Sequence, residues 1–212
     1  MMEPIQATLL GASALASCLY GLRWVDGPPG AIRSGLKAGS VLALACAAVA
    51  LGAPTMVAMG LALGALGDFF LSRAGQSAFM AGMAAFAAGH LAYAVAFWQP
   101  GAPALMAVPL LMLAASTEVW LAPHTGDLRW PVRAYVLVIS LMGFAVLSLG
   151  SAAPLISVGS MLFLTSDVML AIDMFVLKAD PRPRLGLKRL VWASYWGGQL
   201  LILVGSLHLG QI

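Results

Sequence analysis

Three ionisable side chains lie inside stretches of sequence that are otherwise almost wholly apolar. Asp68 and His90 fall in GDFFLSRAGQSAFMAGMAAFAAGHLAY, and Asp167 falls in LFLTSDVMLAIDMF. An isolated charge in hydrocarbon costs at least about 3 kcal/mol on insertion scales, so such groups are usually paired, lined by water or functional. Carboxyl and imidazole groups at that depth serve acid–base chemistry, proton relays or metal binding. Two carboxylates together indicate a functional site.

The composition is that of an integral membrane protein. Of the 212 residues, 61% are hydrophobic and 9% are charged, and the mean hydropathy is +0.95, whereas a soluble domain has about 25% charged residues. Runs such as residues 41–52 and 104–116 have no polar face, which excludes a soluble helical bundle. The sequence therefore predicts an all-α polytopic membrane protein with a single integral membrane domain, residues 1–212.

Windows of about 20 apolar residues, bounded by Gly, Pro and charged residues, predict a bundle of eight transmembrane helices. The predicted spans are residues 5–22, 36–52, 54–72, 78–98, 103–121, 131–149, 153–177 and 189–209. All eleven Lys and Arg residues fall on one side of this arrangement. By the positive-inside rule that side faces the cytoplasm, and both termini face away from it.

The source and the internal symmetry of the chain are also indicated by the sequence. Arg outnumbers Lys by eight to three, which is typical of a bacterium with a GC-rich genome, so the expected location is the bacterial inner membrane. Pro54 precedes Gly67-Asp68 by nearly the interval at which Pro154 precedes Ser166-Asp167. Two matched short motifs are compatible with a four-plus-four parallel repeat in which spans three and seven correspond, and also with chance.

Further polar side chains share helix faces with these groups. Tyr195 and Gln199 are spaced i, i+4, and His90 and Tyr93 are spaced i, i+3, so each pair lies on one face. Such residues can also serve as hydrogen-bonding contacts between helices. Gly60 and Gly64 form a GxxxG pattern, which predicts close helix packing.

The depths of the polar residues predict one cavity that opens from the cytoplasmic half of the bundle. Asp68 is expected about one turn from that surface, Asp167 deeper, and His90 at the floor. Glu118 and Lys37 lie near the cytoplasmic ends of their helices. Both would line the cavity or simply sit at the membrane interface, with Lys37 extended towards water.

Five short motifs occur in order along most of the chain. They are G-D-F-F-L (67–71), F-x-x-G-x-x-x-F-x-x-x-H-x-x-Y (79–93), P-V-x-x-Y (131–135), S-D-x-x-L-A (166–171) and Y-x-x-x-Q (195–199). Their order, from about residue 37 to residue 203, resembles the YhhN-like family of integral membrane lysoplasmalogenases. The resemblance implies an ether hydrolase that cleaves the vinyl ether bond of a lysophospholipid in the bilayer. The products would be a fatty aldehyde and glycerophosphocholine or glycerophosphoethanolamine.

The chemistry of that reaction fits the residues present. A vinyl ether is cleaved by protonation of its β-carbon, which generates an oxocarbenium ion that water traps as a hemiacetal. Two carboxyl groups in unlike environments supply an acid and an anion, as in glycoside hydrolysis. Asp167 is expected to be the protonated general acid, and Asp68 the carboxylate that stabilises the cation and orients water. His90 would tune either carboxyl group or relay the proton, and the roles of Asp68 and Asp167 could be reversed.

The expected substrate-binding residues are the polar side chains nearest these carboxyl groups. They are Tyr93, Tyr195, Gln199, Glu118 and Lys37. Tyr195 and Gln199 would bond the ether oxygen or the glycerol hydroxyl, and the phosphate would face Lys37 or Arg73. We expect no cofactor, no bound metal and no nucleic-acid partner.

Other function classes fit parts of the pattern. Buried Asp and His in an eight-span protein are also usual in a proton-coupled transporter of a small or lipid-like solute, although Pro- or Gly-broken helices at matched positions are missing here. Asp68, His90 and Asp167 are residue types that bind zinc, but no closely spaced pair such as HExxH occurs. A purely structural or regulatory membrane protein would tolerate replacement of Asp68 by Asn.

Overall fold

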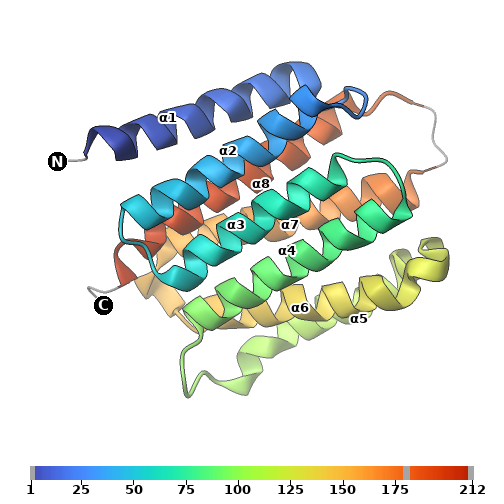
Figure 1. Cartoon of the computed structure of the whole chain (residues 1–212). Coiled ribbons are helices and arrows are strands. Elements are labelled where there is room, and N and C mark those ends of the chain that lie inside the picture. Colours follow the sequence, from blue (N-terminus) through green and yellow to red (C-terminus); the bar gives the residue numbers. More distant parts are fainter. Residues whose placement is uncertain (1–2, 179–181, 210–212) are drawn as a thin grey trace.

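A computed structural model describes residues 3–178 and 182–209 as a bundle of eight α-helices (Figure 1). The helices are α1 (Pro4–Leu19), α2 (Ala31–Ala50), α3 (Thr55–Leu71), α4 (Gln76–Phe97), α5 (Val108–Trp120), α6 (Arg129–Leu147), α7 (Pro154–Ala171) and α8 (Leu185–Ser206). The predicted all-α fold is confirmed, and each predicted span coincides with one helix. Helix α2 begins at Ala31 rather than at residue 36.

Short helical pieces extend the main helices. Helix α1 continues into a π-helical turn, Tyr20–Trp24, and α7 continues into another, Ile172–Val176. Single 3₁₀ turns lie before α5 (Ala104–Ala107), between α5 and α6 (Ala122–His124 and Gly126–Leu128) and before α7 (Gly150–Ala152). π-Helical turns are frequent at functional sites, and both of these lie beside the cavity described below.

Proline and glycine residues mark where helices begin and end. Pro4 and Pro154 occupy the first positions of α1 and α7. A backbone N–H at that position has no acceptor within the helix, so proline, which lacks the N–H, is tolerated there. Gly52 (φ 71°) and Gly75 (φ 103°) take positive φ values in the turns on either side of α3. Glycine adopts that backbone region without steric penalty, so α2, α3 and α4 follow one another through tight turns.

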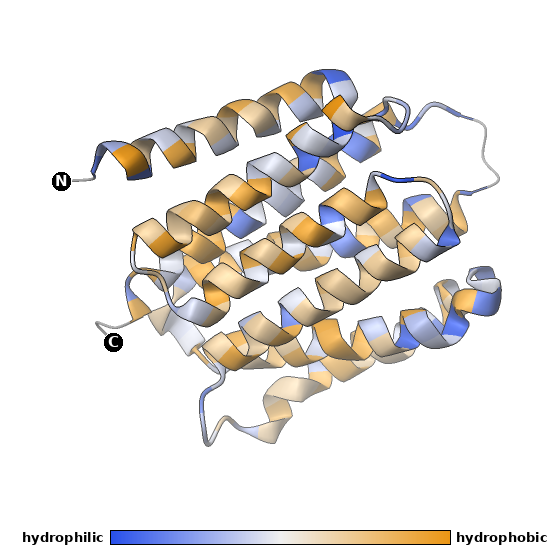
Figure 2. Cartoon of the chain, in the orientation of Figure 1, coloured by the Kyte–Doolittle hydropathy of each residue, from blue (hydrophilic) through white to orange (hydrophobic). Residues whose placement is uncertain are grey.

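The helices are apolar enough for a membrane. Within the described residues, five helices are long and apolar enough to cross one: Pro4–Trp24, Ala31–Ala50, Gln76–Phe97, Gly126–Leu147 and Pro154–Val176. The stretches Thr55–Leu71 and Ala104–Trp120 are apolar but shorter, and α8 falls in neither group. Figure 2 shows apolar residues along most of the length of the helices and hydrophilic residues gathered towards their ends. The chain is therefore a multi-pass integral membrane protein.

The two ends of the bundle differ in charge. Helices α1, α3, α5 and α7 finish at one end, which carries the Arg- and Lys-rich segments and which we call the basic end. The start of α1 and the end of α8 lie at the opposite end (Figure 1). This arrangement agrees with the charge pattern, whereas the side of the membrane that the basic end faces stays a prediction.

Close packing of α3 against its neighbours depends on its glycines. A Cβ atom added to Gly60 would lie 2.6 Å from the Tyr93 ring, and one added to Gly67 would lie 2.6 Å from the Phe86 ring. The approach expected from the glycine pattern is thus observed between α3 and α4. Helix α7 packs mainly against α8, and α5 mainly against α6 at the edge of the bundle. The four-plus-four repeat stays a prediction.

Candidate functional site

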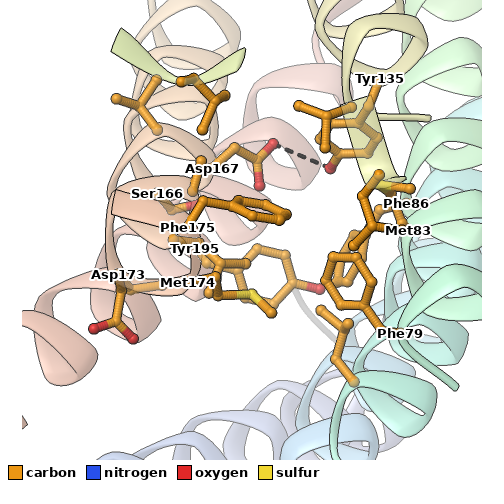
Figure 3. Close-up of a pocket in the computed structure, with 18 of the residues that line it drawn as sticks. Phe79, Met83, Phe86, Tyr135, Ser166, Asp167, Asp173, Met174, Phe175 and Tyr195 are labelled. Carbon is orange, nitrogen blue, oxygen red and sulfur yellow. Dashed lines mark hydrogen bonds between the residues drawn. The ribbon is translucent and has the colours of Figure 1, made fainter. Parts of the chain in front are cut away.

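A cavity of about 950 Å³ runs into the bundle from the basic end and is lined by residues of seven helices. Asp68 of α3, Asp167 of α7, Lys37 of α2 and Tyr195 of α8 all line it. Figure 3 shows the Asp167 carboxyl group and the Tyr135 hydroxyl pointing towards each other within the pocket, joined by a hydrogen bond. The two carboxyl groups singled out from the sequence therefore share one cavity.

Asp68 is held by two polar partners from other helices. Lys37 Nζ lies 3.1 Å from Asp68 Oδ1, and the Tyr195 hydroxyl donates a hydrogen bond of 2.9 Å to Asp68 Oδ2. Helix α3 carries Gly64 one turn before Asp68, where a Cβ would lie 3.0 Å from the Tyr195 hydroxyl. The missing side chain lets Tyr195 reach the carboxylate. An ammonium group and a phenol donor together stabilise the ionised form of Asp68.

A chain of hydrogen bonds continues from Tyr195 into the core. The Gln199 amide Nε2 donates to the Tyr195 oxygen at 3.5 Å, and the Tyr93 hydroxyl donates to Gln199 Oε1 at 2.5 Å. Tyr93 and Gln199 are fully buried and do not line the cavity. Gln199 and Tyr93 therefore orient the Tyr195 hydroxyl that bonds Asp68. Their position does not favour direct contact with a ligand.

Asp167 belongs to a second polar group on the other side of the cavity. His90 Nε2 lies 3.0 Å from Asp167 Oδ2 and 3.2 Å from the Tyr135 hydroxyl. The Tyr135 hydroxyl also donates to Asp167 Oδ2, at 3.4 Å. His90 is almost completely buried behind Asp167 and Tyr135, which both line the cavity. The three groups form a triangle in which protons can pass between carboxyl, imidazole and phenol.

The ring of Phe163 separates the two polar groups. Its centroid lies 4.5 Å from that of His90 and 5.1 Å from that of Tyr195. Phe163 is 2% exposed, so its ring is buried between the two groups. The two aspartates therefore occupy distinct surroundings, one beside a lysine and a tyrosine, the other beside a histidine and a tyrosine.

The accessibility of the two aspartates is the reverse of what sequence position predicted. Asp68 was expected to lie nearer water, but its side chain is 1% exposed, whereas that of Asp167 is 12% exposed. The physical reason is that Lys37 and Tyr195 cover Asp68 from two other helices. The sequence-based prediction used only the distance of each residue along its helix from the membrane surface, which takes no account of side chains on other helices.

Glu118 lies apart from the cavity. Its side chain is 41% exposed and pairs with Arg133, whose Nε donates to Glu118 Oε1 at 2.7 Å, while Arg129 approaches the other oxygen at 3.8 Å. The neighbour Thr117 lines the cavity, but Glu118 does not. The geometry gives no support to the predicted substrate contact of Glu118.

Basic residues gather at the mouth of the cavity. Lys188 pairs with Asp26, and Arg184 pairs with Asp173. Arg73 lies over the Phe69 ring, 4.6 Å from its centroid. Among the residues that the structure describes, Arg33, Arg73 and Lys178 line the cavity without a carboxylate partner, and Arg33 Nε donates to the backbone oxygen of Trp24. These charges are available to an anionic group.

Two residues of this site were not selected from the sequence. Tyr135 belongs to the P-V-x-x-Y motif, and its polar group within an apolar helix was the available signal. Met142, whose sulfur lies 3.0 Å from His90 Nδ1, carries no signal, because methionine is an ordinary residue in a membrane helix.

The three ionisable groups do not gather as a metal-ligand set. Asp68 contacts Lys37 and Tyr195, while His90 contacts Asp167. Within residues 3–178 and 182–209, no three His, Cys, Asp or Glu side chains are arranged so that they could hold a metal ion.

Comparisons with known proteins agree with the motifs. The sequence profile of the YhhN family matches residues 32–206. Lysoplasmalogenase TMEM86A from Bos taurus is 28% identical to this chain over 163 residues, which make up 73% of this chain. The match spans 66% of the bovine protein, slightly less than two thirds of its length. No solved structure matches the chain.

Proposed function

The chain belongs to the YhhN family, and from that premise we propose that it is a lysoplasmalogenase, an ether hydrolase. It would cleave the vinyl ether bond of alkenyl-glycerophosphocholine or alkenyl-glycerophosphoethanolamine to a fatty aldehyde and the glycerophospho compound. The name of the bovine relative supports this substrate class. The observation that carries the proposal is the placement of Asp68 and Asp167 in one cavity, each with different polar partners.

Asp167 is the general acid in this proposal. Its carboxyl group faces the cavity, and His90 and Tyr135 behind and beside it can return a proton after each turnover. Asp167 protonates the β-carbon of the vinyl ether, and the positive charge then resides on the ether oxygen and the α-carbon. A positioned acid of this kind typically contributes about 10² to 10⁴ in rate.

Asp68 is the anion of the pair. Its contacts with Lys37 and Tyr195 support an ionised carboxylate, which attracts the developing oxocarbenium ion and orients the water that traps it. The resulting hemiacetal breaks down to the aldehyde and the glycerol hydroxyl. Lys37 acts mainly as the counter-ion of Asp68 in this scheme, which leaves the phosphate to other cations.

The lining of the cavity supports one orientation of a single-chain lipid. Arg73 and Lys178 at the mouth would bind the phosphate, the arginine through two parallel hydrogen bonds and the lysine as a single charge. Ile139 and Leu164 line the cavity about one helical turn further from the basic end than Tyr135 and Asp167, a distance of about 4.5–6 Å along the helix axis. The alkenyl chain would continue past them into lipid, with the vinyl ether beside Asp167.

The location follows from the same reasoning. All eight helices would span the membrane, with the basic end and the cavity mouth in the cytoplasm and both termini on the other side. The membrane would be the inner membrane of a bacterium.

The experiment that tests this function is aldehyde release from a lysoplasmalogen by the purified protein in detergent. The native protein is run beside Asp68→Asn, Asp167→Asn and the matched control Asp127→Asn, whose exposed carboxylate lies at the cavity mouth. We expect release by the native protein and the control, and a loss of at least about a hundredfold in the other two.

Other outcomes redirect the proposal. No release by protein that elutes as a folded species would overturn it and favour a carrier, because a carrier yields no product without a sealed membrane. Near-normal turnover by Asp167→Asn with loss in Asp68→Asn would reverse the two roles. Adding a chelator to the assay tests zinc chemistry. The proposed mechanism requires no metal, so we expect the chelator to leave turnover unchanged.

A further inference from the structure

The two ring nitrogens of His90 have chemically different partners. Nδ1 lies 3.0 Å from the thioether sulfur of Met142, and Nε2 lies 3.0 Å from Asp167 Oδ2 and 3.2 Å from the Tyr135 hydroxyl. His90 is 1% exposed and Met142 is 3% exposed. The contacts are therefore made inside the protein, where a ring nitrogen without a partner is costly.

The sulfur determines which nitrogen carries the proton. A thioether has no hydrogen to donate and can only accept a weak hydrogen bond. The contact with Met142 is attractive only when Nδ1 bears its hydrogen, because two lone pairs at that distance repel. A neutral imidazole has one N–H group, so Nε2 then presents a lone pair to Asp167 and Tyr135.

A lone pair on Nε2 requires a donor opposite it. An ionised Asp167 would place a second acceptor 3.0 Å away, whereas a protonated Asp167 donates its O–H to Nε2. Among the described residues, Asp167 of α7 and Tyr135 of α6 are the titratable groups within hydrogen-bond distance of the ring. Tyr93, on the same helix as His90, is engaged with Gln199 instead.

We infer that Met142 is a positioning residue that holds His90 in the Nδ1–H tautomer and thereby keeps the acidic proton on Asp167. The catalytic meaning of this arrangement rests on the proposed function, but the tautomer itself does not. In the reaction, Asp167 transfers that proton to the vinyl carbon, and the lone pair of His90 Nε2 helps the carboxyl group to recover a proton from the attacking water.

The first test reads the tautomer directly. The chain has three histidines, so His90 is the only histidine left in the double variant His124→Gln/His208→Gln. The ¹⁵N NMR spectrum of this variant, labelled at histidine and studied in detergent micelles, then reports on His90 alone. At neutral pH we expect a protonated Nδ1 and an unprotonated Nε2, assigned through their couplings to the ring hydrogens. A protonated Nε2, alone or together with Nδ1, would overturn the inference.

The second test removes the sulfur. Met142→Leu keeps the side-chain volume, and such swaps are usually tolerated in cores. We expect the proton to move to Nε2 in this variant, since Nδ1 has lost its acceptor and Asp167 can accept instead. An unchanged ¹⁵N spectrum would contradict a positioning role for Met142.

Turnover provides a separate readout. Met142→Leu is expected to lower kcat about tenfold with KM unchanged, and Met142→Gln, whose amide oxygen can accept from Nδ1–H, is expected to recover most of it. An equal loss in both variants, or a loss confined to KM, would count against the inference. If the native protein releases no aldehyde but shows the expected tautomer, the proposed function fails and the inference stands.

Discussion

Lys37 Nζ lies 3.1 Å from Oδ1 of Asp68, and the pair joins α2 to α3 where the Asp68 side chain is 1% exposed. The charge of this aspartate is therefore compensated from within the site rather than by water. The same contact removes Lys37 from the set of free cations at the cavity mouth. It also makes the stability of the bundle depend on a group that we propose for catalysis.

Replacing Lys37 by Met tests that dependence. Loss of one partner from a buried ion pair typically costs about 3–5 kcal/mol, because the remaining charge has no counter-ion. We expect Lys37→Met to lower the unfolding temperature in detergent and to abolish aldehyde release. The double variant Lys37→Met/Asp68→Asn should regain most of the thermal stability without activity. A single variant as stable as the native protein would show that Asp68 does not rely on Lys37.

Replacing Gly64 by Ala tests whether the missing side chain at this position lets Tyr195 reach Asp68. The new methyl group would lie 2.8 Å from Gln199 Nε2 and 3.0 Å from the Tyr195 hydroxyl. Overpacking of this kind usually costs about 1–3 kcal/mol. We expect a lower unfolding temperature and reduced turnover. The matched control is Gly35→Ala on α2, where nothing lies within 4 Å of the new atom; equal effects in the two variants would refute the explanation.

Removing the hydroxyl of Tyr135 tests its part in proton transfer. Tyr135→Phe keeps the ring that lies 5.6 Å from His90, centroid to centroid, but loses the hydrogen bond to Asp167. We expect kcat to fall about tenfold with KM within twofold, since one hydrogen bond to a reacting group is lost. Tyr20→Phe is the control, because Tyr20 also lines the cavity and its hydroxyl has no hydrogen-bond partner in the described part of the chain. Unchanged kcat in Tyr135→Phe would remove Tyr135 from the mechanism.

Glu118→Gln separates a substrate contact from a surface ion pair. Exposed pairs such as the one with Arg133 contribute little to stability, because water screens the two charges. Because Glu118 does not line the cavity, we expect turnover and KM of Glu118→Gln to differ less than twofold from those of the native protein. A marked rise in KM with lysoplasmalogen would instead restore the substrate contact predicted from the sequence.

The helices and the ionisable groups within them could be predicted from the sequence alone. In lipid, every backbone polar group must be satisfied inside its own segment, so an apolar run of about 20 residues is a helix whatever its neighbours are. The turns on either side of α3 contain Gly52 and Gly75, both at positive φ. Asp68, Asp167 and His90 were identifiable because a charged or polar group in such a run is costly.

The partners of those groups were decided only by the tertiary structure. Asp68 bonds Tyr195, which lies 127 residues away, and Asp167 meets His90 across 77 residues. Such meetings depend on how each helix is rotated and how closely it packs, which side chains on other helices control. The glycines of α3 permit the approach of Tyr195. For the same reason Glu118 turned towards Arg133 and Met142 came to face His90.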